Sequence, residues 1–196
     1  MRHAVIFPLK ANADSPPSAW HARLKRSFPD LSNVAVYIGV DADDDLWNSS
    51  HAAEARELLD FVEVVSPPTQ EKGAVCVVWD RLARRAVADG IDGALVLFGD
   101  DVTYADGGDW LATRVAPALA SDPLQLFHPI DATDASCCTF PIVGAAHVHR
   151  YKRLLPTEFF NQGADPWLHE LYRRADRVCV LHDVTVTNAR GGPVKV

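Results

Sequence analysis

The chain has 196 residues, of which 48% are apolar and 23% charged, which suits one well-buried domain and is too short for two. A formal net charge of −7 argues against non-specific nucleic-acid binding, which requires a basic surface, so we expect no nucleic-acid partner. The sequence has no run of eighteen apolar residues and does not open with the long apolar region of a signal peptide. We therefore expect no transmembrane segment and a soluble, intracellular, cytoplasmic protein.

Apolar runs alternate with helically spaced segments through the first half of the chain. Short apolar runs closed by Pro, Gly or acidic residues predict strands, and apolar residues recurring every three or four positions predict helices. Ser18 is the expected N-cap of the first helix. The pattern is typical of a largely parallel sheet with helices on its faces. In chain order the expected elements are a strand over 4–7, a helix over 18–28, a strand over 34–40, a helix over 51–59, a strand over 61–65, a helix over 74–89 and a strand over 94–98.

The second half is less regular. A loop over 105–109 leads to an expected helix over 110–119, and strands are expected over 124–128 and 139–144. Asp165 is well placed as an N-cap, with Pro166 at the first helical position of a helix that continues through Tyr172. A last strand over 178–181 would end at His182.

Two acids directly follow the strand predicted over 94–98. Its five consecutive apolar residues indicate a central strand buried on both faces. In open α/β sheets the ligand crevice lies beyond the carboxyl ends of the strands, which is where Asp100 and Asp101 are placed. Carboxylate oxygens suit Mg²⁺ or Mn²⁺, and a Mg²⁺ site commonly uses one or two carboxylates plus substrate phosphates. We therefore expect a metal-bound diphosphate here; the alternative is that the two acids only open a turn.

Two segments give the sequence a family resemblance. Phe98-Gly99-Asp100-Asp101-Val102 looks like the DxD region of GT-A glycosyltransferases, which move a sugar from a nucleotide diphosphate to an acceptor, although Gly99 stands where a first Asp often stands. The phrase over 159–168, Phe-Phe-Asn-Gln-Gly-Ala-Asp-Pro-Trp-Leu, and its continuation over 169–174 are similar to the acceptor-side segment of small glycosyltransferase domains of large algal DNA viruses.

The resemblance covers most of the chain and implies its architecture. It implies the α/β class, as a single-domain GT-A (Rossmann-like) fold with a mixed, mostly parallel sheet flanked by helices. The single domain would span 1–196, with a nucleotide-sugar-binding half over 1–104 and an acceptor-binding half over 105–196.

The resemblance also implies a metal-dependent transferase with a nucleotide-diphosphate sugar as donor and a glycan or other hydroxyl acceptor. Mn²⁺ or Mg²⁺ would be held by Asp101 with help from Asp100, and His182 matches a further metal-ligand position of some members; a surface histidine is the alternative. Asp165 would be the base that deprotonates the acceptor, which implies inversion. The alternative for Asp165 is an N-cap, and both roles can coexist because the helix dipole keeps a carboxylate ionised there.

Donor contacts are expected at the ends of the early strands and on the helix over 74–89. Asp41, directly at the end of its strand, would contact the base or ribose, whereas the acids over 43–45 are interpreted as a solvated loop. Solvated surface lysines are the alternative for Lys10 and Lys72. The expected contacts are Phe7, Pro8, Lys10, Asp41, Lys72, Asp80 and Asp100.

Two other functions stay open. A sugar nucleotidyltransferase generally carries a Gly-rich phosphate loop after its first strand, whereas the residues over 7–12 include no glycine. A non-catalytic domain that binds a nucleotide sugar is the other alternative, and Gly99 in place of an acid is the only hint of it.

Overall fold

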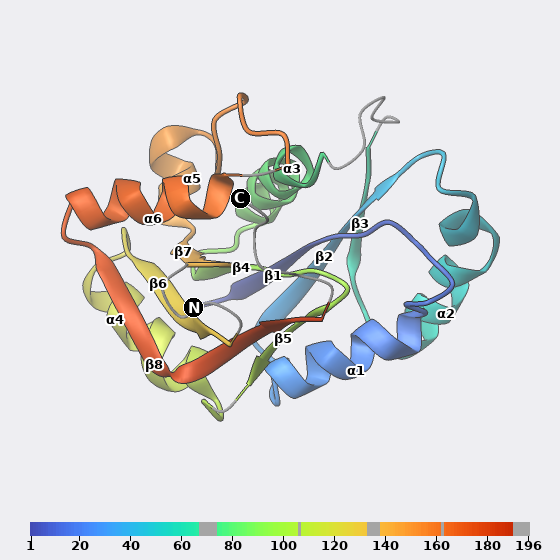
Figure 1. Cartoon of the computed structure of the whole chain (residues 1–196), viewed down its shortest axis with the longest axis horizontal. Helices are drawn as coiled ribbons and strands as arrows, with labels where there is room; N and C mark the ends of the chain where they lie inside the picture. The colour runs from blue at the N-terminus through green and yellow to red at the C-terminus, as the bar shows by residue number, and fades with distance from the viewer. Residues whose placement is uncertain (67–73, 106, 133–137, 162, 190–196) are drawn as a thin grey trace.

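The computed structural model of the chain describes residues 1–66, 74–105, 107–132, 138–161 and 163–189. In these residues eight strands form one sheet in the order β3-β2-β1-β4-β7-β6-β8-β5 (Figure 1). The first four strands in the chain are mutually parallel: β1 (His3–Pro8), β2 (Val34–Asp41), β3 (Val62–Ser66) and β4 (Ala94–Leu97). The predicted α/β class with a mixed, mostly parallel sheet is confirmed.

The remaining strands extend the sheet beyond β4. β7 (Ile142–Gly144) is antiparallel to β4, and β6 (Leu126–Asp131) is antiparallel to β7. β8 (Val178–Asn188) runs parallel to β6 and antiparallel to β5 (Val102–Ala105). β6 and β8 therefore point the same way as β1 to β4, so all six strands end at the same edge of the sheet.

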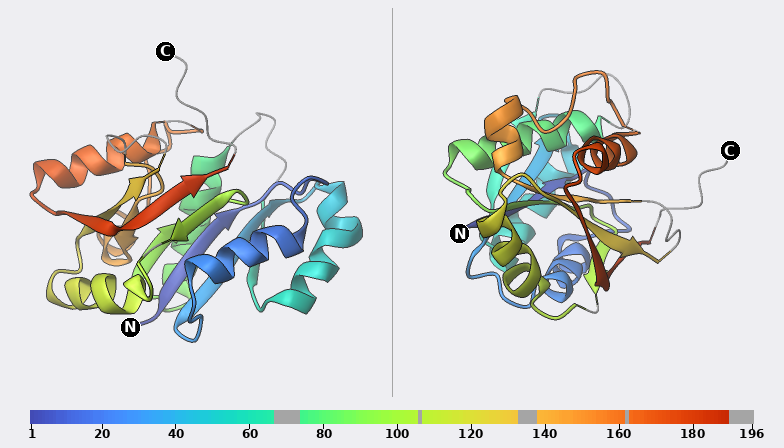
Figure 2. Two further views of the ribbon diagram at one scale, coloured as in Figure 1. Left: turned by 60° about the horizontal axis from the view of Figure 1, so that its bottom comes forward. Right: turned by 90° about the vertical axis from the view of Figure 1, so that its left-hand side faces the viewer.

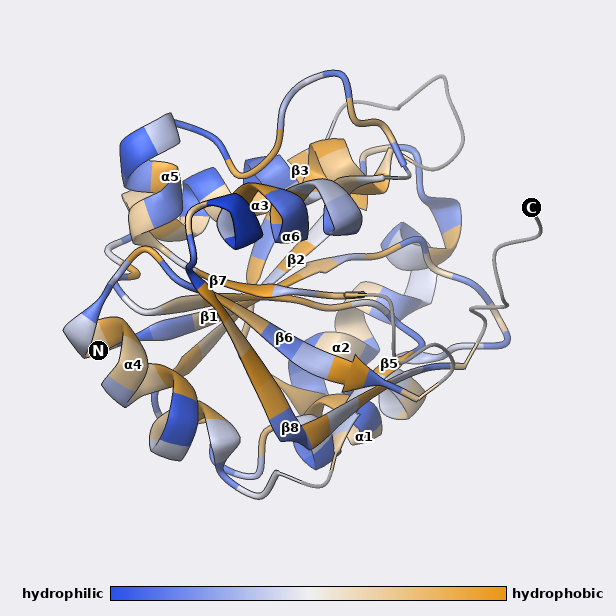
Figure 3. Ribbon diagram, turned by 60° about the vertical axis from the view of Figure 1, so that its left-hand side comes forward, coloured by the Kyte–Doolittle hydropathy of each residue, from blue (hydrophilic) through white to orange (hydrophobic). Residues whose placement is uncertain are grey.

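Helices cover both faces of the sheet (Figure 2). Side chains alternate along β1, so Val5 and Phe7 join the core under α1 while Ala4 and Ile6 join the core under α3. Apolar residues gather in the strands and polar residues on the outer sides of the helices (Figure 3). None of the helices in the described stretches is long and apolar enough to cross a membrane. One face carries α1 (Pro17–Ser27), the π-helical turn η1 (Trp47–His51), α2 (Ala52–Leu58), the π-helical turn η2 (Leu111–Val115) and α4 (Ala116–Ser121); the other carries α3 (Val75–Ala88), α5 (Ala146–Tyr151) and α6 (Ala164–Arg174).

Two elements have other bounds than predicted, and two short elements were not predicted. α1 begins at Pro17 rather than after an N-cap at Ser18, because proline has the backbone angle of a first helical residue and its missing N–H is not needed there. β8 does not stop at Leu181 but runs to Asn188, and the alternation of apolar and polar residues in its second half is the signal of that extension. The short helix α5 and the short strand β5 were not predicted.

Two glycines allow close approaches between elements. A Cβ at Gly144 in β7 would lie 2.2 Å from the carbonyl oxygen of Pro123, a backbone atom that cannot rotate away. A Cβ at Gly39 in β2 would lie 2.4 Å from Cγ1 of Val78 in α3, a side chain that can change rotamer. The backbone contact at Gly144 is therefore the less adaptable of the two.

We expect Gly144→Ala to lower the free energy of unfolding by about 1–3 kcal/mol, the usual cost of overpacking, and Gly39→Ala to cost less. Urea unfolding of the two variants and the wild type measures both values. A wild-type midpoint for Gly144→Ala, or a larger loss for Gly39→Ala, would contradict the close approach of β7 to the backbone before β6.

Candidate functional site

Parallel strands deliver several predicted residues to one edge of the sheet, which we call the carboxyl edge. β1 ends at Pro8, β2 ends at Asp41, and β4 is followed closely by Asp100 and Asp101. Asn188, the last residue of β8, pairs with the residue that follows Asp101. The structure thus brings these predicted residues to the edge where ligands of open α/β sheets bind.

The turn that carries Asp100 and Asp101 is held by its backbone. Nη1 of Arg23 in α1 donates to the carbonyl oxygen of Asp100 at 2.6 Å, and the backbone N–H of Ala189 donates to the carbonyl of Asp101 at 3.0 Å. Nδ2 of Asn12 lies 3.5 Å from Oδ2 of Asp100. Arg23 and Asn12 were not predicted, because both are distant in sequence from this turn and no local pattern marks them.

A divalent cation fits this turn by donor chemistry. Asp100 and Asp101 are partly exposed and offer the hard oxygen ligands that Mg²⁺ and Mn²⁺ take. Within the described part of the chain, no three His, Cys, Asp or Glu side chains are grouped to hold a metal. One or two carboxylates suffice where substrate phosphates complete the coordination. Asp101, with Asp100, is therefore the group that would hold the ion.

His182 lies too far from Asp101 along β8 for both to bind one metal ion, so the prediction of His182 as a metal ligand is wrong. β8 continues past His182, and the stretch from Thr185 to Asn188 that pairs with β5 spans about 10 Å by itself. His182 lies further back along the strand with an exposed side chain, whereas two ligands of one ion must each lie about 2 Å from it. The prediction failed because it ended the strand at Leu181, seven residues before its observed end at Asn188.

Asp41 lies among charges of both signs. Burial raises the pKa of Asp41, the negative charge of Asp43 raises it further, and the positive charges of Lys10 and Arg81 lower it. Lys10 is exposed at the carboxyl edge, and Nη1 of Arg81 in α3 is enclosed and makes no hydrogen bond within the described chain. One acid and two cations therefore gather at the end of β2, and Arg81 was not predicted.

Phe7 belongs to the core and not to a donor site, which corrects its prediction. Its side chain is fully buried, with its ring centroid 5.2 Å from that of Trp20 and 5.5 Å from that of Phe98 in edge-on contacts. Pro8, by contrast, is half-buried at the end of β1. Lys72 lies outside the described residues.

Asp80 anchors a loop, and its predicted contact with the nucleotide stays a prediction. Its Oδ1 accepts the backbone N–H groups of Leu154 at 2.6 Å and Leu155 at 3.4 Å. Its Oδ2 forms an ion pair with Arg84 at 3.0 Å. Both carboxylate oxygens are committed to α3 itself and to the segment after α5.

Two buried acids at the carboxyl edge were not predicted as such. Asp44 accepts the backbone N–H of Ala11 at 2.8 Å and that of Trp47 at 2.9 Å, which ties the loop after β1 to the segment after β2. The interpretation of its acidic run as a solvated loop is therefore wrong at this position. Asp131, the last residue of β6, is also buried and accepts a hydrogen bond from Oγ1 of Thr139.

Asp165 lies in the first turn of α6 and not at its N-cap. The helix begins at Ala164 after Gly163, whose φ of +84° is a left-handed value that glycine adopts without strain. Oδ1 of Asp165 is enclosed and accepts no hydrogen bond in the described structure, while the carboxylate accepts the backbone N–H of Phe140. Burial raises the pKa of Asp165 to about 7, and the N–H of Phe140 opposes this shift.

Phe140 lies between Asp165 and the turn that carries Asp100 and Asp101. Its φ of +48° is rare for a bulky side chain, and such strain clusters at functional sites. While its N–H donates to Asp165, its carbonyl oxygen lies 2.7 Å from the hydroxyl of Tyr104. Its ring packs edge-on against Trp79 and would lie 4.0 Å from a Cβ built on Gly99. Asp165 therefore lies at the carboxyl edge, beside the end of β4.

We expect Asp165→Asn to stabilise the fold at pH 8 and not at pH 4. The folded protein binds the Asp165 proton with a pKa of about 7 and the unfolded chain with one near 3.8, so wild-type stability falls as pH rises through this window. The asparagine variant has no such loss, so its advantage in the free energy of unfolding grows to at most about 4 kcal/mol. Urea unfolding at several pH values measures it.

Asp176→Asn is the matched control, because Asp176 is exposed at the other end of α6 and its left-handed backbone suits asparagine. It should show no such pH-dependent gain. An equal advantage of Asp165→Asn at pH 4 and pH 8 would contradict a buried carboxyl with a raised pKa.

No protein-family model matches the chain, and no curated protein sequence does. Solved structures match at low identity. TarS of S. aureus (1–349) in complex with UDP is 12% identical, with a TM-score of 0.66 over 95% of this chain and 60% of that one. The mannosyltransferase PcManGT of Pyrobaculum calidifontis, in complex with GDP-Man and Mn²⁺, is 15% identical, with a TM-score of 0.64 over 99% of this chain and 58% of that one.

Glucosyl-3-phosphoglycerate synthase of Mycobacterium tuberculosis, in complex with Mg²⁺ and UDP, is 13% identical, with a TM-score of 0.58 over 98% of this chain and 73% of that one. The chain thus spans about 60% of the TarS and PcManGT chains. The particular similarity to algal-virus domains stays a prediction. The fold is the mixed-sheet, Rossmann-like GT-A fold of glycosyltransferases, as the resemblance implied.

Proposed function

We propose that this chain is a metal-dependent, inverting glycosyltransferase that moves a sugar from a nucleotide-diphosphate donor to a glycan or other hydroxyl acceptor. One observation carries the proposal: Asp165, with an enclosed Oδ1 and a pKa raised to about 7 by burial, accepts the backbone N–H of Phe140, and the Phe140 ring faces Gly99 in the segment that bears Asp100 and Asp101. The fold supports it, because structures of that fold carry UDP, or GDP-Man with Mn²⁺.

The donor would lie across the ends of β1, β2 and β4, within the half of the chain over 1–104. Lys10 and Pro8 would line the path of the nucleotide, with Lys72 as a further candidate, and Asp41 would accept hydrogen bonds from the base or ribose. A diphosphate placed beside Asp100 needs a counter-cation, because carboxylate and phosphate repel each other. A divalent ion held by Asp101 and Asp100 would, when bound, stabilise the charge on the departing diphosphate as a Lewis acid.

Asp165 would serve the acceptor, within the half of the chain over 105–196. As the acceptor oxygen attacks the anomeric carbon, the carbon–oxygen bond to the donor phosphate breaks and the nucleoside diphosphate leaves with the electron pair. The acceptor hydroxyl proton passes to the Asp165 carboxylate. A pKa near the working pH suits a general base, because enough of the group is ionised and it still holds the proton well. Direct displacement of this kind inverts the anomeric centre.

We expect a nucleoside diphosphate or its sugar to stabilise the protein in a metal-dependent way, and Asp101→Asn to lose that metal dependence. Binding to the native state raises stability by RT ln(1 + [L]/Kd), about 2.7 kcal/mol at a hundredfold excess over Kd. Thermal unfolding with UDP, GDP, dTDP and CDP and their sugars, each with and without Mn²⁺ or Mg²⁺, measures it. Asp45→Asn, an exposed acid in the segment after β2, is the matched control and should behave as wild type.

No stabilisation by any of these ligands would contradict the donor proposal. Full turnover and an unchanged metal dependence in Asp101→Asn would contradict the metal assignment. Donor binding without transfer or hydrolysis of the sugar would favour the non-catalytic alternative.

We expect kcat/KM for transfer to fall as pH drops through about 7, because the base must be deprotonated and burial holds the pKa of Asp165 near that value. Asp165→Asn should lower kcat by about 10²–10⁴-fold and leave the donor-induced thermal shift intact. Initial rates between pH 5 and 9, with Asp176→Asn as control, measure both effects. Wild-type turnover in Asp165→Asn would place the base elsewhere.

A further inference from the structure

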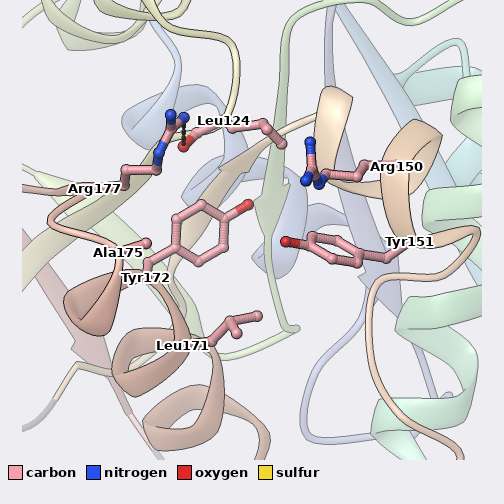
Figure 4. Close-up of a pocket in the computed structure, with 7 residues that line it drawn as sticks. All are labelled: Leu124, Arg150, Tyr151, Leu171, Tyr172, Ala175 and Arg177. Carbon is pink, nitrogen blue, oxygen red and sulfur yellow. Dashed lines mark hydrogen bonds between the residues drawn. The ribbon is translucent and has the colours of Figure 1, made fainter.

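A cavity of about 220 Å³ lies between α5 and α6, away from the carboxyl edge. Leu124 and Arg177 precede β6 and β8, and the first residues of those strands are level with the start of β4. The cavity is therefore at the opposite edge of the sheet, where the strands begin. Seven residues line it (Figure 4): Leu124, Arg150, Tyr151, Leu171, Tyr172, Ala175 and Arg177.

Two arginines give the cavity a positive charge. Nη1 of Arg177 lies 2.7 Å from Oδ1 of Asp122 and 3.3 Å from the carbonyl oxygen of Leu124, so a carboxylate already balances this guanidinium. Arg150 is exposed and lies 5.8 Å from the ring centroid of Tyr151, and no carboxylate of the described chain forms an ion pair with it. One unbalanced guanidinium therefore lines this cavity in a chain whose net charge is −7.

The hydrogen bond between Tyr172 and His147 leaves the Tyr172 hydroxyl able to accept, but not to donate, toward a ligand. Nε2 of His147 lies 3.0 Å from the carbonyl oxygen of Leu154, which can only accept, so this nitrogen carries the proton. Burial lowers the pKa of His147 to about 4, so the ring is neutral near pH 7 and its Nδ1 accepts. The hydroxyl of Tyr172, 2.8 Å from Nδ1, must then donate to it. The lone pairs of Tyr172 are left to accept from a ligand.

We infer that this cavity binds a small hydroxylated anion, of the sugar-phosphate or sugar-acid class. The anionic group would accept hydrogen bonds from Arg150 and from the hydroxyl of Tyr151, which points toward that of Tyr172 (Figure 4). A hydroxyl of the ligand would donate to Tyr172. The volume is below the roughly 300–1,000 Å³ of pockets for drug-sized ligands, which limits the occupant to about one sugar ring.

The test is isothermal titration of the full chain in EDTA with glucose 6-phosphate and with glucuronate, the two sources of this chemistry. At least one should bind saturably, and glucose and inorganic phosphate should each bind at least tenfold more weakly. Arg150→Gln should weaken binding by about ten- to a hundredfold, because it removes a charge-assisted hydrogen bond. Tyr172→Phe should weaken it as well, because it removes the acceptor.

Two variants serve as matched controls, and both should bind the sugar phosphate or sugar acid with wild-type affinity. Arg153→Gln removes an exposed arginine three residues further along, outside the cavity, and Asp101→Asn alters the carboxyl edge. Absence of binding by both sugars, wild-type affinity in Arg150→Gln, or lost affinity in Asp101→Asn would overturn the assignment. Phosphate binding as tightly as glucose 6-phosphate would overturn the ligand class. Circular dichroism checks folding, and Arg150→Gln decides the matter if Tyr172→Phe does not fold. Nucleotide binding is measured separately, so either proposal can fail alone.

Discussion

The left-handed backbone of Phe140 is the constraint on which the candidate site depends. One peptide segment donates its N–H to Asp165 on α6 and presents its carbonyl to the hydroxyl of Tyr104 on β5. The ring of the same residue packs on Trp79 of α3 and reaches toward Gly99. A β-region φ at this position would turn the N–H and the carbonyl in other directions, so the strain is the cost of joining four elements at one point.

The surroundings that raise the pKa of Asp165 also affect its neighbours. Burial raises the pKa of the Cys76 thiol to about 11, and the negative charge of Asp165 adds to that shift. A site from which water is partly excluded strengthens every charge interaction within it, including those of an attacking hydroxyl and a departing diphosphate. The same exclusion makes the ionised carboxylate energetically costly, and among the described residues the Phe140 N–H is the group that offsets this cost. The stability lost on ionisation and the proposed basicity therefore have one cause.

Periodicity and strand order predicted the parallel half of the fold and the edge at which Asp41, Asp100 and Asp101 meet, because buried parallel strands are long apolar runs with polar residues at their ends. They could not tell which way Phe7 points, since both faces of its strand are covered. The prediction for His182 was wrong because the second half of β8 resembles a polar tail. Only its alternation of apolar and polar residues indicates that it is a strand. Arg23 and Asn12 contact the turn that carries Asp100 and Asp101 from distant parts of the chain, and no local pattern reveals such tertiary contacts.

The close packing of the turn that carries Asp100 and Asp101 explains the glycine at position 99. A Cβ on Gly99 would lie 3.2 Å from Cγ2 of Val102 and 3.4 Å from Oδ1 of Asp101, closer than most real Cβ contacts. An aspartate at 99 would crowd Asp101 and place a second negative charge beside it. Asp100, one residue after Gly99, supplies the acid that accompanies Asp101. The backbone carbonyl of Asp100 accepts a hydrogen bond from Arg23, so a cation lies close to Asp100 and Asp101. Gly99 is therefore compatible with the proposed metal site and does not by itself indicate a non-catalytic domain.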